Sequence, residues 1–243
     1  MKSKIIRIAF ALLIMAVILF QFTILSRATE TISNEMIAWG LKRSDNHQPP
    51  KLDSASLEVL NKYNGLAIGN SENPCLYLTF DLGYEAGYTA QILDVLKEND
   101  VKAVFFITGH YLNTQPDLVK RMIEEGHVVG NHTVNHKSLP SLSDSEIEKE
   151  IMDLHKALFD KFGYEMTYFR PPKGEFSEKV LNIITNLGYS PVLWSFAYDD
   201  WDENKQGREE YGKSKILDNL HNRKYSSFTC DKQRQRKYFR FNY

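Results

Sequence analysis

The sequence predicts an α/β fold, in which helices cover a parallel sheet that is either closed into a barrel or open. Strand-like and helix-like patterns alternate from Cys75 onward, as repeated βα units do. Polar side chains directly follow several apolar runs, and α/β folds place their chemistry at such strand ends. The 243 residues, 42% of them hydrophobic and 25% charged, are enough for one large domain with its own core.

Short apolar runs bounded by polar residues predict the strands. The predicted strands are 76–80, 103–107, 127–129, 168–169 and 192–194. Residues 29–70, which precede them, are interpreted as a linker and lead-in, because 46–50 is polar and ends in proline.

Four helices are predicted from apolar residues at helical spacing and from their end signals. The predicted helices are 87–99, 116–126, 143–163 and 177–188. Pro116 suits a first helical position, and Ser143 with Glu146 forms a capping box. Ser177 caps the last of these helices, and Gly188 ends it.

The first 28 residues are predicted to be a targeting segment outside the fold. Lys2, Lys4 and Arg7 precede an apolar run over 8–25, which as a helix would be roughly 27 Å long, close to the thickness of a bilayer core. Residues 26–28 weakly resemble a cleavage site. A cleaved signal peptide and an uncleaved membrane anchor both remain open, and the length of the run favours the anchor. In either case the rest of the chain is expected to be exported.

Net charge and cysteine content argue against two classes of function. The formal net charge is −1, which gives the molecule as a whole no electrostatic basis for binding nucleic acid. Cys75 and Cys230 form neither a CxxC pair nor a disulfide framework, so we do not expect thiolates to bind a metal.

A carboxylate, two imidazoles and a guanidinium carry the functional signal. Asp81 ends an apolar run, and taken alone it would be a turn aspartate. His132 and His136 have the i, i+4 spacing of two metal ligands on one helical face, although two unrelated surface histidines would look the same. Thr133 excludes the H-E-x-x-H zincin motif. Arg170 precedes two prolines, and an ordinary ion pair is its alternative. Together these groups are the parts of a metal-assisted hydrolase.

In this order, the residues resemble the motifs of the polysaccharide deacetylase family, the NodB-homology carbohydrate esterases. Residues 79–83 (TFDLG) match T-F-D-D-G except at Leu82, 132–136 (HTVNH) match H-[ST]-x-x-H, and 170–174 (RPPKG) match R-x-P-x-G. The fourth motif, D-x-x-D-W, is matched only at Asp200 and Trp201. The resemblance implies a deformed (β/α) barrel of the NodB-homology type over residues 71–222.

Three further stretches resemble the branch that de-N-acetylates muramic acid and forms δ-lactam in spore cortex peptidoglycan. They are 83–85 (GYE), 109–112 (GHYL) and 115–120 (QPDLVK). The implied substrate is therefore peptidoglycan or another N-acetylated glycan, from which acetate leaves and a free sugar amine remains.

The resemblance also implies a role for each matched residue. His132 and His136 would hold a divalent metal, Zn²⁺ or another, that polarises the N-acetyl carbonyl and its bound water. Asp81 would be the general base, and Arg170 would orient it and keep it ionised.

Substrate contacts are expected from Tyr84, Lys173 and Trp201. Leu82 departs from the family, most of which carries an aspartate there as a third metal ligand, while the muramic-acid branch often has asparagine. Because leucine has no donor atom, the metal would rest on two histidines and on water.

Residues 223–243 do not fit the family pattern. The family ends in a strand with L-x-L-H, whose histidine is the general acid, and this motif is missing from the sequence. The segment carries seven Lys or Arg and one Asp, which indicates either a basic tail or a frameshift. Codons chosen for 224–241 and read one base later encode NILLLHAISKDNANILDS, which restores the strand and its histidine. We favour an out-of-frame tail, which would truncate the fold before its last strand and helix.

The resulting hypothesis is an exported, metal-dependent de-N-acetylase of peptidoglycan amino sugars that is impaired in this chain. A catalytically inactive, membrane-anchored glycan-binding protein is the alternative, favoured by Leu82 and by the missing acid. A basic-tailed protein that binds surfaces is a second alternative.

Overall fold

A computed structural model describes residues 14–15, 32–44, 48–68, 76–198 and 209–219 of the chain. The chain from Asn34 onward forms one compact unit, distinct from Met1–Ser33. Most of the predicted targeting segment, Trp201 and the tail from 223 lie outside the described residues. Within the described residues, no helix combines the length and the apolarity needed to cross a membrane.

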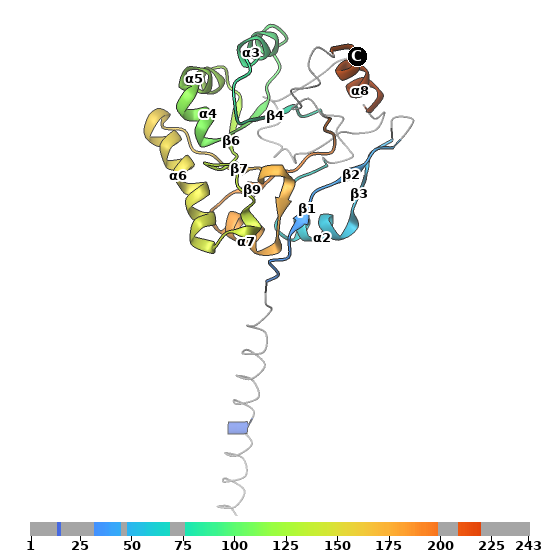
Figure 1. Cartoon of the computed structure of the whole chain (residues 1–243), viewed down its shortest axis with the longest axis vertical. Coiled ribbons are helices and arrows are strands. Elements are labelled where there is room, and N and C mark those ends of the chain that lie inside the picture. Colours follow the sequence, from blue (N-terminus) through green and yellow to red (C-terminus); the bar gives the residue numbers. More distant parts are fainter. Residues whose placement is uncertain (1–13, 16–31, 45–47, 69–75, 199–208, 220–243) are drawn as a thin grey trace, which may run out of the picture. The chain divides into compact units, whose positions relative to one another are not determined.

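A five-stranded parallel sheet forms the centre of the unit (Figure 1). Its strands, in spatial order, are β4 (Thr79–Leu82), β5 (Val104–Ile107), β6 (Val128–Asn131), β7 (Tyr168–Phe169) and β9 (Ser190–Pro191). The spatial order of these strands is also their order along the chain. At least one helix lies between each strand and the next, as the alternating pattern predicts. The α/β fold class is therefore confirmed.

Helices surround the strands in an arc (Figure 1). They are α3 (Thr89–Glu98), α4 (Gly109–Thr114), α5 (Pro116–Glu124), α6 (Asp144–Phe162), α7 (Glu178–Asn186) and, after the sheet, α8 (Glu209–Asn219). The end signals act as predicted: both hydrogen bonds of the capping box between Ser143 and Glu146 are present, Gly163 ends α6 in the left-handed conformation, and the Ser177 side chain accepts from the Val180 N–H.

The two faces of the sheet have different environments. On β5, Phe105 and Ile107 belong to the main hydrophobic core shared with the helices, whereas Val104 and Phe106 form a smaller cluster with Val192. This alternation is the two-residue period of a strand. The smaller cluster therefore lies on the opposite face of the sheet from the core that β5 shares with the helices.

The curvature of the sheet follows from one contact. Arg170 follows β7, yet its Nη1 donates to the Thr79 hydroxyl on β4 at 3.0 Å. Strands β5 and β6 lie between β4 and β7, so the sheet must curl to bring these residues together. This is the curvature expected of a partial (β/α) barrel.

The segment interpreted as a linker and lead-in is structured over 34–44 and 48–68. Strand β1 (Ile37–Ala38) pairs antiparallel with β8 (Glu175–Phe176), and β2 (Leu41–Lys42) pairs with β3 (Lys51–Leu52). Helix α2 (Ser54–Lys62) follows, with Asp53 as its N-cap. These residues are thus part of the domain, because their apolar side chains pack on the main core.

Four of the five predicted strands have different bounds, and the first and the last differ most. The first begins at Thr79 rather than at residue 76, and the last is Ser190–Pro191, not 192–194. The run after β9 still bonds to its neighbours, since the Val192 N–H donates to the Phe169 carbonyl and the Leu193 N–H to that of Leu66. The prediction located a buried hydrogen-bonded run but misplaced the strand by two residues.

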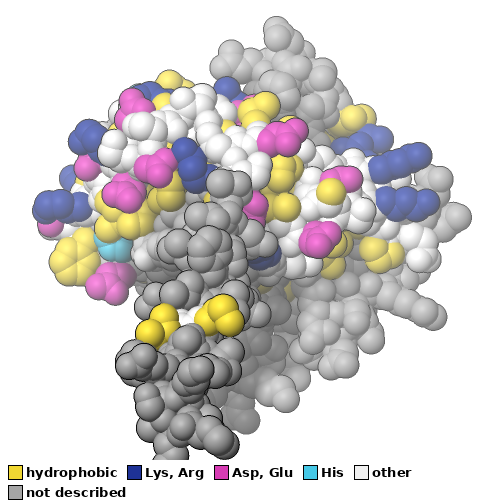
Figure 2. All heavy atoms as spheres, turned by 90° about the horizontal axis from the view of Figure 1, so that it is seen from below, with side chains coloured by type: hydrophobic (Ala, Val, Ile, Leu, Met, Phe, Trp, Pro, Cys, Tyr) yellow, Lys and Arg dark blue, Asp and Glu magenta, His cyan; other side chains and the backbone are white. Residues whose placement is uncertain are grey.

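Figure 2 shows one face of the molecule, seen from below the view of Figure 1. Basic and acidic side chains are interspersed on this face, with hydrophobic side chains between them. A mixed surface of this kind accords with the net charge of −1.

Candidate active site

Arg170 and Asp81 form the centre of the candidate site. Arg170 Nη1 donates to Asp81 Oδ1 at 2.6 Å, and the Arg170 side chain is only 3% exposed. Two carbonyl groups beyond β9 accept further guanidinium hydrogens, that of Val192 from Nε at 3.2 Å and that of Leu193 from Nη2 at 3.3 Å. Together with the bond from Nη1 to the Thr79 hydroxyl, four of the five guanidinium N–H groups have an acceptor, one more than the three hydrogens of a lysine could supply.

Aromatic rings enclose the same guanidinium. The Arg170 Cζ atom lies 4.2 Å from the centre of the Phe106 ring and 5.7 Å from that of Trp194. These cation–π contacts, together with the hydrogen bonds, fix the position at which the guanidinium meets the carboxylate.

Asp81 stays ionised in this position. Burial raises the pKa of its carboxyl, but the charge of Arg170 and the Arg170 hydrogen bond outweigh it, so that the pKa is lowered overall. Its side chain is 37% exposed, so solvent and a substrate can reach the carboxylate. An ionised, accessible carboxylate is what a general base requires.

His132 and His136 meet through a loop and not on a helix, so the prediction of one helical face is wrong. Residues 132–136 have no helical assignment, and Thr133 and His136 have φ values of 69° and 54°. The ring centres of the histidines are nonetheless 4.8 Å apart. The i, i+4 spacing predicts a helical repeat, whereas in the structure two residues in the left-handed conformation bring the rings together.

His132 has the orientation of a metal-ligating histidine. Its Nδ1 lies 2.7 Å from the Arg170 carbonyl oxygen, which can only accept, so the ring proton sits on Nδ1. The lone pair of Nε2 is then directed to the side where Asp81 Oδ2 lies 3.9 Å away. Burial lowers the pKa of His132 and of His136, which favours neutral imidazoles that can bind a metal.

Comparison with known proteins identifies this arrangement. A sequence model of the family described as polysaccharide deacetylase matches residues 68–192. The chain belongs to the polysaccharide deacetylase family. It is therefore a hydrolase of the deacetylase type, as the motif resemblance predicts.

Relatives extend over most of this deacetylase chain. It is 42% identical over 193 residues to the peptidoglycan-N-acetylmuramic acid deacetylase PdaA of Bacillus subtilis, covering 79% of this chain and 73% of the relative. An uncharacterised 30.6 kDa protein of Geobacillus stearothermophilus is 44% identical over 213 residues, 87% of this chain and 80% of its own.

The solved structure of Bacillus subtilis PdaA, a family 4 carbohydrate esterase, superposes with a TM-score of 0.76 at 41% identity. The superposition covers 78% of this chain and 82% of that one. The expectation of a NodB-type fold is thus confirmed.

The donors in this deacetylase fit a metal held by two imidazoles. His132 and His136 are neutral, adjacent and in part oriented by the Arg170 carbonyl, and imidazole nitrogen is a common ligand of Zn²⁺. Among the described residues, no group of three or more His, Cys, Asp or Glu is arranged to hold a metal. Leu82 instead packs against the main core, so water or substrate would have to complete the coordination.

Two of the three expected substrate contacts lie on the exposed surface. The Tyr84 residue is 79% exposed, and its ring lies 4.4 Å from that of His110. Lys173 is exposed in a left-handed conformation, and its charge contributes to the lowered pKa of His136. The third, Trp201, lies outside the described residues.

Two tryptophans that the sequence did not indicate support the arginine motif. Trp39 N–H donates to the Gly174 carbonyl at 2.9 Å, and its indole N–H donates to the Trp194 carbonyl at 2.9 Å. A Cβ on Gly174 would lie 2.7 Å from the Trp194 ring, and Gly174 has a φ of 70°. The glycine of the motif is therefore required both by its backbone conformation and by the ring that packs on it.

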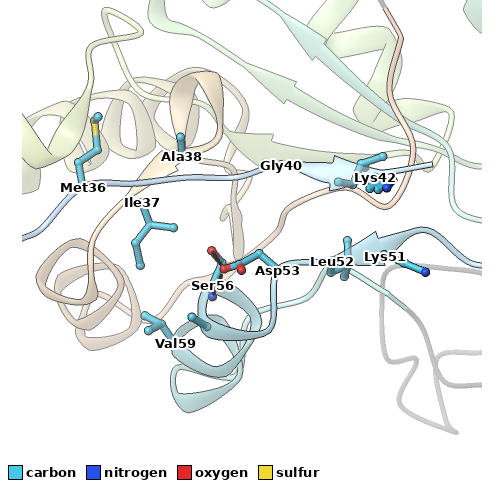
Figure 3. Close-up of a pocket in the computed structure, with 12 residues that line it drawn as sticks. Met36, Ile37, Ala38, Gly40, Lys42, Lys51, Leu52, Asp53, Ser56 and Val59 are labelled. Carbon is cyan, nitrogen blue, oxygen red and sulfur yellow. Dashed lines mark hydrogen bonds between the residues drawn. The ribbon is translucent and has the colours of Figure 1, made fainter. Parts of the chain in front are cut away.

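A separate groove of about 700 Å³ lies beside α2 and the β2–β3 hairpin (Figure 3). Its lining includes Ile37, Leu52, Asp53 and Val59, and none of the residues expected in the active site. Asp53 is engaged in capping α2, since it accepts hydrogen bonds from the backbone and hydroxyl of Ser56. The only carboxylate among the lining residues is therefore already engaged.

Proposed function

We propose that this deacetylase hydrolyses the N-acetyl group of muramic acid in peptidoglycan, as an enzyme of the δ-lactam-forming, spore cortex type. One observation carries the proposal: Asp81 offers one oxygen to Arg170 at 2.6 Å, while its other oxygen lies 3.9 Å from the free nitrogen of His132. The 42% identity to a peptidoglycan-N-acetylmuramic acid deacetylase supports the choice of substrate.

The catalytic roles follow from the positions of the side chains. Asp81 Oδ2, the oxygen that Arg170 Nη1 does not hold, takes a proton from the water that attacks the acetyl carbon. Arg170 keeps Asp81 ionised and aimed in this direction. The bond between carbon and nitrogen then breaks, releasing acetate and an amine that must gain a proton.

His132 and His136 hold the divalent metal in this proposal. When bound, the metal supplies Lewis acidity at the acetyl oxygen and a more acidic water. The two histidines contribute neutral nitrogen donors, and Lys173 and Tyr84 would contact the glycan. The protein would act outside the cytoplasm, secreted or anchored by its apolar N-terminal segment, as the basic residues before that segment suggest.

Acetate release from N-acetylated peptidoglycan tests the proposal. The purified chain is incubated with cortex-type peptidoglycan with and without Zn²⁺, and the muropeptides are then analysed by mass spectrometry. We expect a loss of one acetyl group per modified muramic acid, dependent on metal and absent in Asp81→Asn. Acetate release that persists in Asp81→Asn would remove Asp81 from the role of base. Loss of acetyl from glucosamine alone would replace muramic acid as the substrate.

Leu82 favours a second candidate function, an inactive protein that binds glycans in the same cleft. The leucine side chain packs on the core and offers no donor where the family motif carries aspartate. The missing C-terminal histidine adds to this argument. Retention of N-acetylated peptidoglycan by the chain without acetate release at any metal concentration would favour this candidate.

A further inference from the structure

The loop between the two histidines is held in an unfavourable conformation. Thr133 and His136 both have positive φ values, and Thr133 is β-branched, a side chain that disfavours this region strongly. Such residues persist only where the surroundings fix them. The Thr133 N–H donates to Asn131 Oδ1 at 2.9 Å, and the His136 N–H donates to the Thr133 hydroxyl at 2.9 Å.

Glu150 on α6 accepts hydrogen bonds from the two remaining backbone N–H groups of residues 133–136. Its carbonyl accepts from the Val134 N–H at 3.0 Å, and its Oε2 accepts from the Asn135 N–H at 2.8 Å. Its Oε1 accepts from the Asn135 side-chain amide at 2.7 Å, with Lys137 Nζ at 3.4 Å. All four N–H groups of residues 133–136 thus have an acceptor, and one helical residue provides two of these acceptors.

The position of Glu150 is unusual for a glutamate. The residue is 5% exposed, and a buried carboxylate is costly unless it is paired and hydrogen-bonded. The bonds of its side chain run to Asn135 in the loop that carries the histidines and to Lys137 directly after it. The buried carboxylate of Glu150 therefore stabilises the conformation of the loop.

We propose that Glu150 is a positioning residue that holds the loop so that His132 and His136 face one another as metal ligands. The inference rests on the proposed function, because it takes these histidines as the ligands. Glu150 acts through Asn135 and touches neither the metal nor the substrate. Its role is that of an outer partner of the ligands, whose loss weakens metal binding without removing a ligand.

The variant Glu150→Gln tests this role. The amide keeps one acceptor but presents an NH₂ group to a second donor, so one of the two bonds to Asn135 is lost. We expect Zn²⁺ to bind about 10- to 100-fold more weakly, measured by competition with a chromophoric chelator. In the metal-free protein, hydrogen exchange at the amides of Val134 and Asn135 should accelerate.

A matched control lies on the same helix. Glu146 also accepts hydrogen bonds, from the Ser143 N–H and hydroxyl, but it caps α6 and does not touch the loop. Glu146→Gln should therefore leave Zn²⁺ affinity and the exchange of the loop amides as in the wild type. An equal effect of both variants would mean that Glu150 acts only through the stability of α6, and would overturn the proposal.

Reversing the polarity of the pair gives a rescue. In the double variant Glu150→Gln/Asn135→Asp, the new amide can donate to the new carboxylate while its oxygen accepts the backbone N–H, and net charge equals that of the wild type. Zn²⁺ affinity should return to within a few-fold of the wild-type value. Failure to recover, or an unchanged affinity in Glu150→Gln, would overturn the proposal.

Two further outcomes separate this inference from the proposed function. If Glu150→Gln does not fold, Asn135→Ala at the exposed neighbouring position removes one contact and must still weaken Zn²⁺ binding; unchanged affinity there counts against Glu150. If the wild type binds no divalent metal, the metal-dependent function fails. The exchange rates in the metal-free protein then still decide whether Glu150 holds the loop.

Discussion

His127 makes the stability of the domain depend on pH. The His127 side chain is 1% exposed, and its Nδ1 accepts a hydrogen bond from the Ala103 N–H at 3.1 Å. Burial lowers its pKa to about 4, with help from the charge of Lys102, against the opposing effect of Glu125. The folded domain therefore holds a neutral imidazole where the unfolded chain would take up a proton.

The size of the effect follows from the two pKa values. Because the folded pKa is lower than the unfolded value of about 6.5, the contribution is fully present above pH 6.5 and is lost as the pH falls toward 4. The difference of about 2.5 pH units, at about 1.4 kcal/mol each, gives a limit of about 3 kcal/mol. About 2 kcal/mol of this should be lost already at pH 5.

Urea unfolding at pH 7.5 and pH 5 measures this loss. His127→Asn keeps an acceptor near the Ala103 N–H but cannot take up a proton, so its stability should fall about 2 kcal/mol less between the two pH values than that of the wild type. His110→Asn, at an exposed position, controls for the loss of one histidine. If the wild type and His127→Asn lose the same free energy of unfolding between pH 7.5 and 5, the buried neutral state of His127 is refuted.

Three further outcomes are expected. His132→Ala should lower the metal content of the purified protein, measured by mass spectrometry of the metal, whereas His110→Ala should not; equal contents would contradict the ligand assignment. Gly174→Ala should destabilise the domain by about 2 kcal/mol in thermal melts and reduce acetate release, because it adds left-handed strain and a clash with Trp194; an unchanged melt would contradict it. Deleting one base near codon 223 should raise acetate release by about 10²–10⁴-fold through the restored acid, and equal activity would refute the frameshift.

The helices could be predicted from the sequence because their end signals are local. The capping box of Ser143 and Glu146 and the left-handed Gly163 lie within or beside the helix they define. The meeting of Asp81 with Arg170 could also be anticipated, since Asp81 lies near the carboxyl end of β4 and Arg170 directly follows β7 in the same parallel sheet. The carboxyl ends of parallel strands meet at one edge of a sheet, so the two side chains were expected to lie close together.

Non-local contacts could not be predicted in the same way. The indole of Trp39 bonds to the Trp194 carbonyl across 155 residues, and no spacing in the sequence encodes that pairing. The prediction that His132 and His136 lie on one helical face was wrong for a related reason. Two residues four apart meet on a helix, but they also meet across a loop, and the acceptor that selects the loop is Glu150 on the next helix. A spacing of four residues therefore indicates that two side chains can meet, but it does not by itself indicate a helix.

Arg170 joins the curvature of the sheet to the chemistry of the site. The same guanidinium that bonds Thr79 on β4 and the carbonyls beyond β9 also keeps Asp81 ionised. A change that opens the sheet must therefore take the arginine away from the carboxylate. The base then loses its main source of positive charge while it remains partly buried, and its pKa must rise. The histidine loop touches this arginine only through the Arg170 carbonyl, and Glu150 on α6 provides two of its other supports. Stability and the charge of the base should consequently change together at Arg170, whereas the histidine loop can be weakened with the sheet intact.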